Sequence, residues 1–293
     1  MRYFSLNYNL ESLKKAGFVL RPDTSIKELW EKVKKTFIAH DIEPILLDES
    51  ATLVGEQGVD FETLCTETDF IVALGGDGTL LSSSRRAYKY KKAVLGINAG
   101  NLGFLTDICV ANIDNFLDGL RTGKYRIDER MMMEGMIESK THKSKSFFAL
   151  NDIVLTRPNI YKMVKIDAAI DEKWFNTYRG DGLVVSTPTG STAYNLAAGG
   201  PVMYPLTKAF IMTPISAHSL TQRPLVVPAD FTIELSSRED NLIAVIDGQD
   251  DYELQTGDIL HIRGAKRGAR LLHSIEGSYF DVLREKLSWG DRR

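Results

Sequence analysis

The first part of the chain alternates segments with helical and strand-like hydrophobic patterns. Residues 25–39 carry apolar side chains at near-helical spacing, which predicts an amphipathic helix. Short apolar runs of strand length lie at 43–47, 70–74 and 93–97, and the segment 79–90 between the last two is compatible with a helix. Strands separated by helices favour a parallel sheet that binds its ligand at the carboxyl ends of the strands.

The pattern changes after about residue 123, where short strands replace the alternation. The segments with strand patterns are 136–138, 146–156, 165–170, 182–186, 231–235, 243–246 and 259–262. The last segment, 279–287, returns to a helical pattern. We therefore predict a Rossmann-like, doubly wound α/β domain over 1–123 and a β-rich, sandwich-like domain over 124–274, with the tail 275–293 packing back on the first domain.

Composition is consistent with two domains and excludes several classes of protein. The chain has 293 residues, 43% of them hydrophobic, and a formal net charge of -3, which argues against a nucleic-acid-binding protein. Its two cysteines, Cys65 and Cys109, lie far apart, and its five histidines have no metal-ligand spacing. No secretory signal and no membrane-spanning run is visible. These features predict a cytoplasmic protein with no membrane partner.

A glycine-rich loop follows the strand at 70–74. Gly75, Gly76, Gly78 and Thr79 lie between a buried strand and a helix, where backbone N–H groups can approach phosphate oxygens without a Cβ in the way. The loop is neither a Walker A motif nor G-x-G-x-x-G, and a tight strand-to-helix turn is the alternative. Asp77 favours chemistry, because a carboxylate here repels phosphate unless it holds a metal or takes a proton from an attacking hydroxyl.

Four further segments are rich in polar or glycine residues. The segment 98–106 follows the next strand and is expected beside the first loop; its Phe104 could stack on a base or belong to the core. Residues 151–152 and 181–182 could each be a simple turn. The segment 186–194 combines five hydroxyl residues with a proline and a glycine, and its uncharged donors suit the groups of a nucleotide.

Together these segments resemble the NAD kinase (ATP-NAD kinase) family in order and spacing. The resemblance runs from about residue 71 to residue 249 and includes the tail at 279–289. It is carried by Gly75-Gly76-Asp77-Gly78-Thr79, by Gly96-Ile97-Asn98 through Gly103-Phe104-Leu105, by Asn151-Asp152 and Asp181-Gly182, and by Thr187-Pro188-Thr189-Gly190-Ser191-Thr192-Ala193-Tyr194. It implies a phosphotransferase with an alcohol acceptor, which moves the γ-phosphate of ATP to the 2′-hydroxyl of the adenosine ribose of NAD and makes NADP.

The resemblance also implies roles for individual residues. Asp77 would be the general base. The dinucleotide would be bound between the two domains, often across a subunit interface of a homodimer or homotetramer. Its binding residues would be Asp77, Gly78, Phe104, Asn151, Asp152, Lys162, Arg179, Asp181, Thr192, Ala193, Tyr194, Asn195, Leu196, Ala197 and Gln249. Asp152 stands where many members have Glu, which shortens the reach of the acid by one methylene.

The resemblance assigns no protein ligand to a metal ion. We expect Mg²⁺ on the phosphates of the donor, with ATP, or polyphosphate in its place, supplying the phosphoryl group. Two rival functions remain open from the sequence. Diacylglycerol and sphingoid-base kinases share the Gly-Gly-Asp-Gly loop, and a nucleotide-sensing module could keep the fold without turnover. The segment 187–194 argues against the first rival, and an intact Asp77 argues against the second.

Overall fold

A computed structural model describes residues 13–100, 103–157, 163–238 and 242–290. The chain forms two compact units: residues 1–129 together with 269–293, and residues 130–268. Lys162, which the family resemblance assigns to dinucleotide binding, lies outside the described residues.

The first unit is built on a seven-stranded sheet within the described ranges. Its strand order is β2-β1-β3-β4-β19-β6, and β5 pairs with β4. The strands β1, β2, β3, β4, β5 and β19 pair in parallel. The strands are β1 (Lys15–Leu20), β2 (Glu43–Leu46), β3 (Phe70–Gly75), β4 (Ala93–Asn98), β5 (Ile108–Cys109), β6 (Tyr125–Arg130) and β19 (Ala269–Ser274). The helices are α1 (Ile26–Ala39), α2 (Asp48–Val54), α3 (Phe61–Glu67), α4 (Asp77–Ala87), α5 (Ile113–Arg121) and α7 (Tyr279–Leu287).

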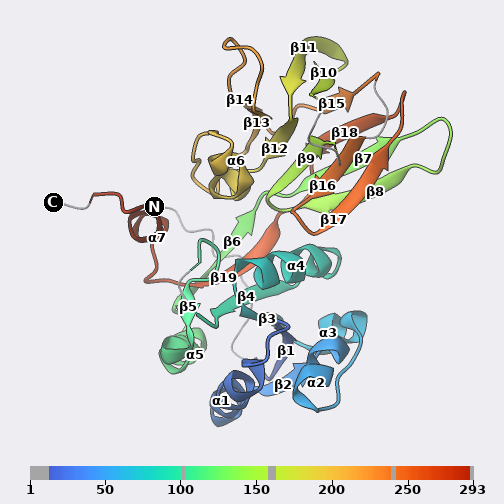
Figure 1. Ribbon diagram of the computed structural model, residues 1–293. Helices are drawn as coiled ribbons and strands as arrows, with labels where there is room; N and C mark the ends of the chain where they lie inside the picture. The colour runs from blue at the N-terminus through green and yellow to red at the C-terminus, as the bar shows by residue number, and fades with distance from the viewer. Residues whose placement is uncertain (1–12, 101–102, 158–162, 239–241, 291–293) are drawn as a thin grey trace. The chain divides into compact units, whose positions relative to one another are not determined.

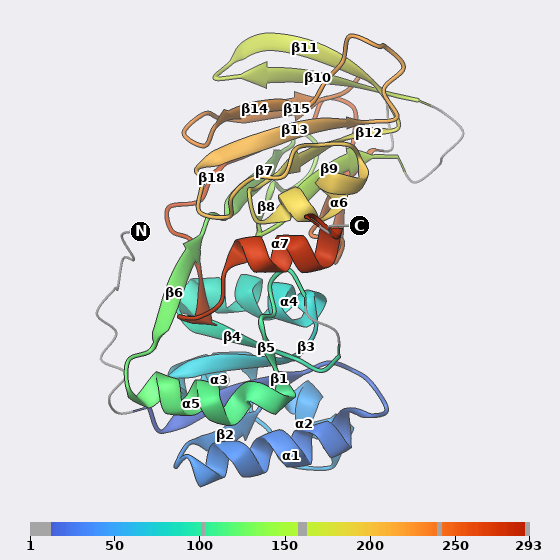
Figure 2. The same ribbon diagram turned by 90° about the vertical axis from the view of Figure 1, so that its left-hand side faces the viewer.

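Helices cover both faces of this sheet, because its strands are apolar on both sides. In β3, Phe70, Val72 and Leu74 face one core cluster, which also contains side chains of α1, α2 and α5. Ile71 and Ala73 point the other way, into a second cluster that contains side chains of α3 and α4. Figure 2 shows α1 and α5 on one side of the sheet and α4 on the other. Side chains that alternate in this way fill both faces of a doubly wound sheet, as the pattern predicts.

The second unit is a sandwich of two antiparallel sheets, each with six strands in the described residues (Figure 1). One sheet has the order β11-β10-β15-β18-β7-β8 and the other β14-β13-β12-β9-β16-β17. Apolar side chains of both sheets form one core. The first sheet contains β7 (Met133–Glu138), β8 (Lys145–Ala149), β10 (Val164–Ile170), β11 (Lys173–Gly180), β15 (Ile233–Ser236) and β18 (Ile259–Gly264). The second contains β9 (Asp152–Thr156), β12 (Gly182–Ser186), β13 (Ala209–Ile215), β14 (Leu225–Pro228), β16 (Leu242–Ile246) and β17 (Asp250–Leu254), with the one-turn helix α6 (Tyr194–Ala197) after β12.

The structure corrects the sequence prediction at residues 146–156 and at two strands that connect the units. The segment 146–156 forms two strands, β8 and β9, which belong to different sheets. The strands β6 and β19 fall within the range 124–274 that we expected to form the second domain, yet they pair in the sheet of the first unit. Backbone pairing, rather than hydrophobic pattern, decides to which unit these two connecting strands belong.

No helix among the described residues has the length and apolar character needed to span a membrane.

Candidate functional site

The glycine-rich loop joins β3 to α4. Gly76 is the N-cap residue of α4, and its carbonyl oxygen accepts from the N–H groups of Thr79 and Leu80. A Cβ on Gly75 would lie 2.4 Å from Thr79 Oγ1, so the packing of the loop requires glycine there. A Cβ on Gly76 or Gly78 would meet nothing within 4 Å. The last two glycines therefore leave open space at the start of an eleven-residue helix, where N–H groups and the helix dipole favour an anion.

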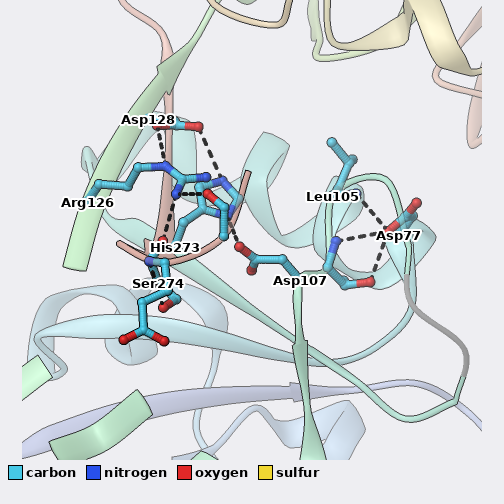
Figure 3. Close-up of polar contacts among 10 residues, drawn as sticks. Asp77, Leu105, Asp107, Arg126, Asp128, His273 and Ser274 are labelled. Atoms are coloured by element: carbon cyan, nitrogen blue, oxygen red, sulfur yellow. Dashed lines mark hydrogen bonds and ion pairs between the residues drawn. The ribbon is translucent and has the colours of Figure 1, made fainter. Parts of the chain in front are cut away.

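The Asp77 carboxylate is held by the segment that follows β4. Its Oδ2 accepts a hydrogen bond from the N–H of Phe104 at 2.8 Å. Its Oδ1 accepts from the N–H groups of Leu105 and Thr106, both at 3.1 Å, and from Thr106 Oγ1 at 3.0 Å. Asp77 thus fastens the loop after β3 to the loop after β4 (Figure 3). A bound metal ion or a substrate proton would each be a reason for a carboxylate here, and this tether is a third.

Thr106 continues the network into the core. It is fully buried, and its hydroxyl accepts from Asn98 Nδ2 at 2.8 Å while donating to Asp77. Asn98 Oδ1 in turn accepts from the N–H of Gly100 at 2.7 Å. A buried network in which each hydroxyl and amide has a partner is rigid, so it fixes the position of the Asp77 carboxylate before any ligand arrives.

A second carboxylate, Asp247, organises the site in the second unit. It lies in the three-residue turn between β16 and β17, residues 247–249, where Asp247 and Gly248 both have positive φ, 51° and 64°. Its oxygens accept from the N–H groups of Leu150, Asn151 and Asp152 at 2.9, 2.8 and 3.0 Å. These N–H groups are therefore bonded to a side chain rather than to a neighbouring strand. This is the physical reason why 146–156 divides into two strands at residues 150–151.

The hydroxyl-rich segment 186–194 packs against the same backbone. Thr187 donates through Oγ1 to the carbonyl of Leu150 at 2.6 Å and through its N–H to the carbonyl of Asn151 at 2.8 Å. A Cβ on Gly190 would lie 2.1 Å from the Asn151 carbonyl oxygen, so only glycine allows this approach. Most of the hydroxyls in the segment are buried. They build the loop, rather than forming the open row of donors that the composition suggested.

A pocket of about 340 Å³ opens where these segments meet. This volume lies in the range of small-molecule sites. Its lining combines carboxylate, amide and aromatic groups with short apolar side chains. The lining residues are Asn151, Asp152, Val154, Thr156, Ala193, Tyr194, Val245, Asp247 and Gly248. Four of them, Asn151, Asp152, Ala193 and Tyr194, are residues that the family resemblance assigns to dinucleotide binding.

The acidity of Asp152 is perturbed in this pocket. Only 4% of Asp152 is exposed, and burial, followed by the negative charge of nearby Asp247, raises the pKa of its carboxyl to about 7. The folded protein therefore holds a proton on Asp152 between the ordinary value of 3.8 and about 7, while the unfolded chain releases it. The free energy of unfolding falls across this window as the pH rises, because the folded state binds more protons.

We expect the Asp152→Asn variant to lose this pH dependence. An amide of the same shape has no proton to release, so the stability of the variant relative to the unsubstituted protein should rise between pH 4 and pH 7. The rise should be at most about 4 kcal/mol, since one pKa unit corresponds to about 1.36 kcal/mol. Urea unfolding at a series of pH values, without nucleotide, measures it. Asp251→Asn on the exposed strand β17 is the control. Parallel stability curves for Asp152→Asn and the unsubstituted protein would contradict the assignment.

Several other residues that the family resemblance assigns to binding lie outside the pocket lining. Arg179 and Asp181 are exposed at the β11–β12 junction and do not line the pocket, although the Asp181 carbonyl accepts from the pocket residue Thr156. Gln249 is exposed as the third residue of the turn between β16 and β17. Phe104 is half-buried beside Asp77, which its N–H contacts. Thr192 and Leu196 are partly buried, and Ala197 is exposed.

Asn195 is fully buried and bonded within the protein. Its Nδ2 donates to the carbonyls of Ser191 and Pro201, both at 3.1 Å, and its Oδ1 accepts from Thr213 Oγ1 at 2.7 Å. The visible role of Asn195 is to hold the turn after the hydroxyl-rich segment.

Asp247 is a functional residue of the pocket that the sequence did not reveal. An Asp-Gly pair after an apolar strand is a signal for a tight hairpin, and the structure has that hairpin. Nothing in the pattern indicates that the carboxylate is bonded to N–H groups about a hundred residues earlier in the chain. For metal binding, no three His, Cys, Asp or Glu side chains in the part of the chain that the structure describes are grouped to hold an ion.

A parallel α/β unit with a glycine loop and a tethered carboxylate, followed by a β-sandwich with a polar pocket, defines a two-domain nucleotide-handling protein. Its residues 11–125 match the ATP-NAD kinase N-terminal domain, and residues 150–274 match the ATP-NAD kinase C-terminal domain. The chain belongs to the ATP-NAD kinase family. This membership decides against the lipid-kinase alternative.

Similar proteins span almost the whole chain. The NAD kinase of Wolinella succinogenes is 50% identical over 284 residues, covering 96% of this chain and 98% of that protein. The NAD kinase of Sulfurimonas denitrificans is 47% identical over 280 residues, covering 95% and 98%. Among solved structures, yeast NADH kinase complexed with NADH has a TM-score of 0.86 at 24% identity, covering 96% of this chain and 89% of that one. An Archaeoglobus fulgidus NAD kinase in complex with ATP has a TM-score of 0.74 at 24% identity, covering 94% and 98%. These two confirm the predicted fold.

Proposed function

We propose that this chain is an NAD kinase that transfers the γ-phosphate of ATP to the 2′-hydroxyl of the adenosine ribose of NAD. The observation that carries the proposal is the fixed Asp77 carboxylate beside an open glycine loop at a helix N-terminus, in a chain that is 50% identical to a curated NAD kinase over nearly its full length. The loop supplies a place for phosphate, and the carboxylate supplies an acceptor for a hydroxyl proton.

The hydrogen bonds of Asp77 indicate which of its oxygens acts. Oδ1 accepts three bonds from the protein, whereas Oδ2 accepts one, from the N–H of Phe104. A carboxylate oxygen has two lone-pair sites, so Oδ2 retains room for a further donor. We assign the contact with the substrate hydroxyl to Oδ2. Since phosphoryl transfer has a loose transition state, this carboxylate acts chiefly by orienting the nucleophile and accepts its proton late.

The second unit is proposed to bind the dinucleotide. The pocket residues Asn151, Asp152 and Tyr194 offer an amide, a carboxyl that keeps its proton up to about pH 7, and an aromatic face. Asp247 supports them by fixing the backbone of residues 150–152. Arg179, Asp181 and Gln249 are proposed binding residues as well, on the family resemblance. The same resemblance supports eight further residues as dinucleotide-binding residues: Gly78, Phe104, Lys162, Thr192, Ala193, Asn195, Leu196 and Ala197.

ATP is proposed as the donor, with Mg²⁺ bound to its phosphates as part of the substrate. The chain would neutralise the remaining charge through the N–H groups of its glycine loop. We also propose that the chain forms a homodimer or homotetramer. A cytoplasmic location is proposed as well, because the two free thiols of Cys65 and Cys109 suit a reducing compartment.

Incubation of the purified chain with several acceptors and donors tests the proposal. We expect NADP from NAD with Mg-ATP, no transfer after chelation of the divalent ion, and no phosphorylation of diacylglycerol. Repeating the assay with NADH and with polyphosphate defines the acceptor and donor range, and the mass of the native particle defines the oligomer. Phosphorylated diacylglycerol, or binding of NAD without any transfer, would contradict the proposed function.

A further inference from the structure

The segment that holds Asp77 continues directly into a second polar cluster of the first unit. Asp107 follows Thr106 in the chain, and its Oδ2 lies 3.0 Å from Nδ1 of His273 on β19. The other ring nitrogen of His273, Nε2, lies 3.6 Å from Asp128 Oδ2 on β6. Arg126, also on β6, completes the cluster (Figure 3). The four side chains come from three segments that are distant in sequence.

Burial makes each contact in this cluster consequential. His273 is 4% exposed, and the side chains of Asp107 and Asp128 are 15% and 12% exposed. The second oxygen of Asp107, Oδ1, is buried and has no hydrogen-bond partner among the described residues. Among the described residues, the contact of the Asp107 carboxylate with a side chain is therefore the one with the His273 ring. Leaving a buried carboxylate without a partner is costly, so the loop would have to move if that ring were removed.

Arg126 joins the cluster to the start of the C-terminal tail. Its Nε lies 3.3 Å from Asp128 Oδ1, and its Nη1 donates to the carbonyls of Ser274 and Gly277 at 2.6 and 2.7 Å. These bonds fix the backbone at Ser274 and Gly277, directly after His273. The ring is thereby fixed from β6 as well as from its own strand, and it is a rigid support for Asp107.

We propose that His273 is a positioning residue for the phosphoryl transfer. It holds Asp107, which fixes the loop at residues 104–106, whose N–H groups orient the Asp77 carboxylate. This inference rests on the proposed function, because it assigns His273 an effect only through the role of Asp77. A displacement of about 1 Å at the reacting group can lower turnover by about a hundredfold, so a change at His273 should act on kcat.

Two isosteric substitutions separate the two ring nitrogens. The side-chain nitrogen of asparagine lies near the place of histidine Nδ1, and that of glutamine near the place of Nε2. His273→Asn should keep a donor toward Asp107, and His273→Gln should keep one toward Asp128 only. In the full-length chain, with NAD and Mg-ATP, we expect His273→Ala and His273→Gln to lower kcat by about tenfold to a hundredfold. His273→Asn should retain most of it, with KM for NAD within about threefold in all three variants.

The same substitutions in an Asp77→Asn background distinguish positioning from loss of fold. If His273 acts through Asp77, His273→Gln should lower the residual turnover of that background by less than about twofold. Equal kcat for His273→Asn and His273→Gln would overturn the proposal. It would also be overturned if His273→Gln lowered the turnover of the Asp77→Asn variant by the same factor as it lowers that of the unsubstituted chain. If His273→Ala does not fold, the comparison of Asn with Gln still decides. No NADP from the unsubstituted chain would instead contradict the proposed function, and normal turnover of Asp77→Asn alone would overturn the role of Asp77 through which His273 is proposed to act.

Discussion

Replacement of Asp77 by asparagine is expected to lower turnover by about two to four decades, the range that removal of a general base gives. The asparagine side chain has one acceptor oxygen, and its amide nitrogen donates hydrogen bonds instead of accepting them. In either orientation that nitrogen meets N–H donors, those of Leu105 and Thr106 on one side or that of Phe104 on the other. The variant therefore loses both the acceptor for the substrate proton and part of the tether that places it.

The same substitution should also reduce stability, by about 1 to 3 kcal/mol, because buried donors lose their acceptor. Initial rates of NADP formation measure the first effect, and urea unfolding measures the second. Asp48→Asn is the matched control: Asp48 is also the first residue of a helix, but it is exposed. It should leave both the rate and the stability close to those of the unsubstituted chain. An Asp77→Asn variant with a near-normal rate would remove Asp77 from the mechanism.

The Gly103→Ala variant is expected to lose activity to a similar degree without any change in charge. A Cβ on Gly103 would lie 1.9 Å from Asp77 Oδ1 and 2.5 Å from Thr106 Oγ1, distances that no relaxed structure contains. The methyl group must separate the Asp77 carboxylate from the loop that holds it. We expect turnover to fall by about a hundredfold or more, since positioning of the reacting group is lost.

Steady-state kinetics with NAD and Mg-ATP test this prediction. Gly119→Ala in helix α5 is the control, because a Cβ there would be 3.4 Å from its nearest neighbour, the Lys124 carbonyl oxygen, which is an ordinary contact. The control should keep normal kcat. Normal kcat in Gly103→Ala would show that catalysis does not depend on the bonds between Asp77 and the loop after β4.

The parts of the fold with strong local signals were predictable. Helix α1 and strands β3, β4 and β12 lie within a residue of the predicted ranges, because their apolar patterns are long or uninterrupted. Strand β1 was not predicted. It lies between β2 and β3, but its first half has the small residues Ala16 and Gly17, which have little strand preference. Gly17 is needed there because a Cβ would lie 2.7 Å from Leu64.

The candidate site was predictable in its residue types and less so in its contacts. The glycine loop and Asp77 stood out because a carboxylate among phosphate-binding glycines is unfavourable without a reason. The bonds from Asp77 to residues 104–106 depend on a loop almost thirty residues later, so no local pattern indicates them. Asp247 and His273 are similar cases. Each acts on a segment more than ninety residues away.

The product formed by the purified chain and by Asp77→Asn shows whether the chain phosphorylates the 2′-hydroxyl of NAD with the help of Asp77. Both proteins are incubated with NAD and Mg-ATP, and the product is assayed with a dehydrogenase that accepts only the 2′-phosphorylated dinucleotide. We expect NADP from the unsubstituted chain and at most about one hundredth of that rate from Asp77→Asn. A product phosphorylated at another hydroxyl, or equal rates for the two proteins, would contradict this expectation.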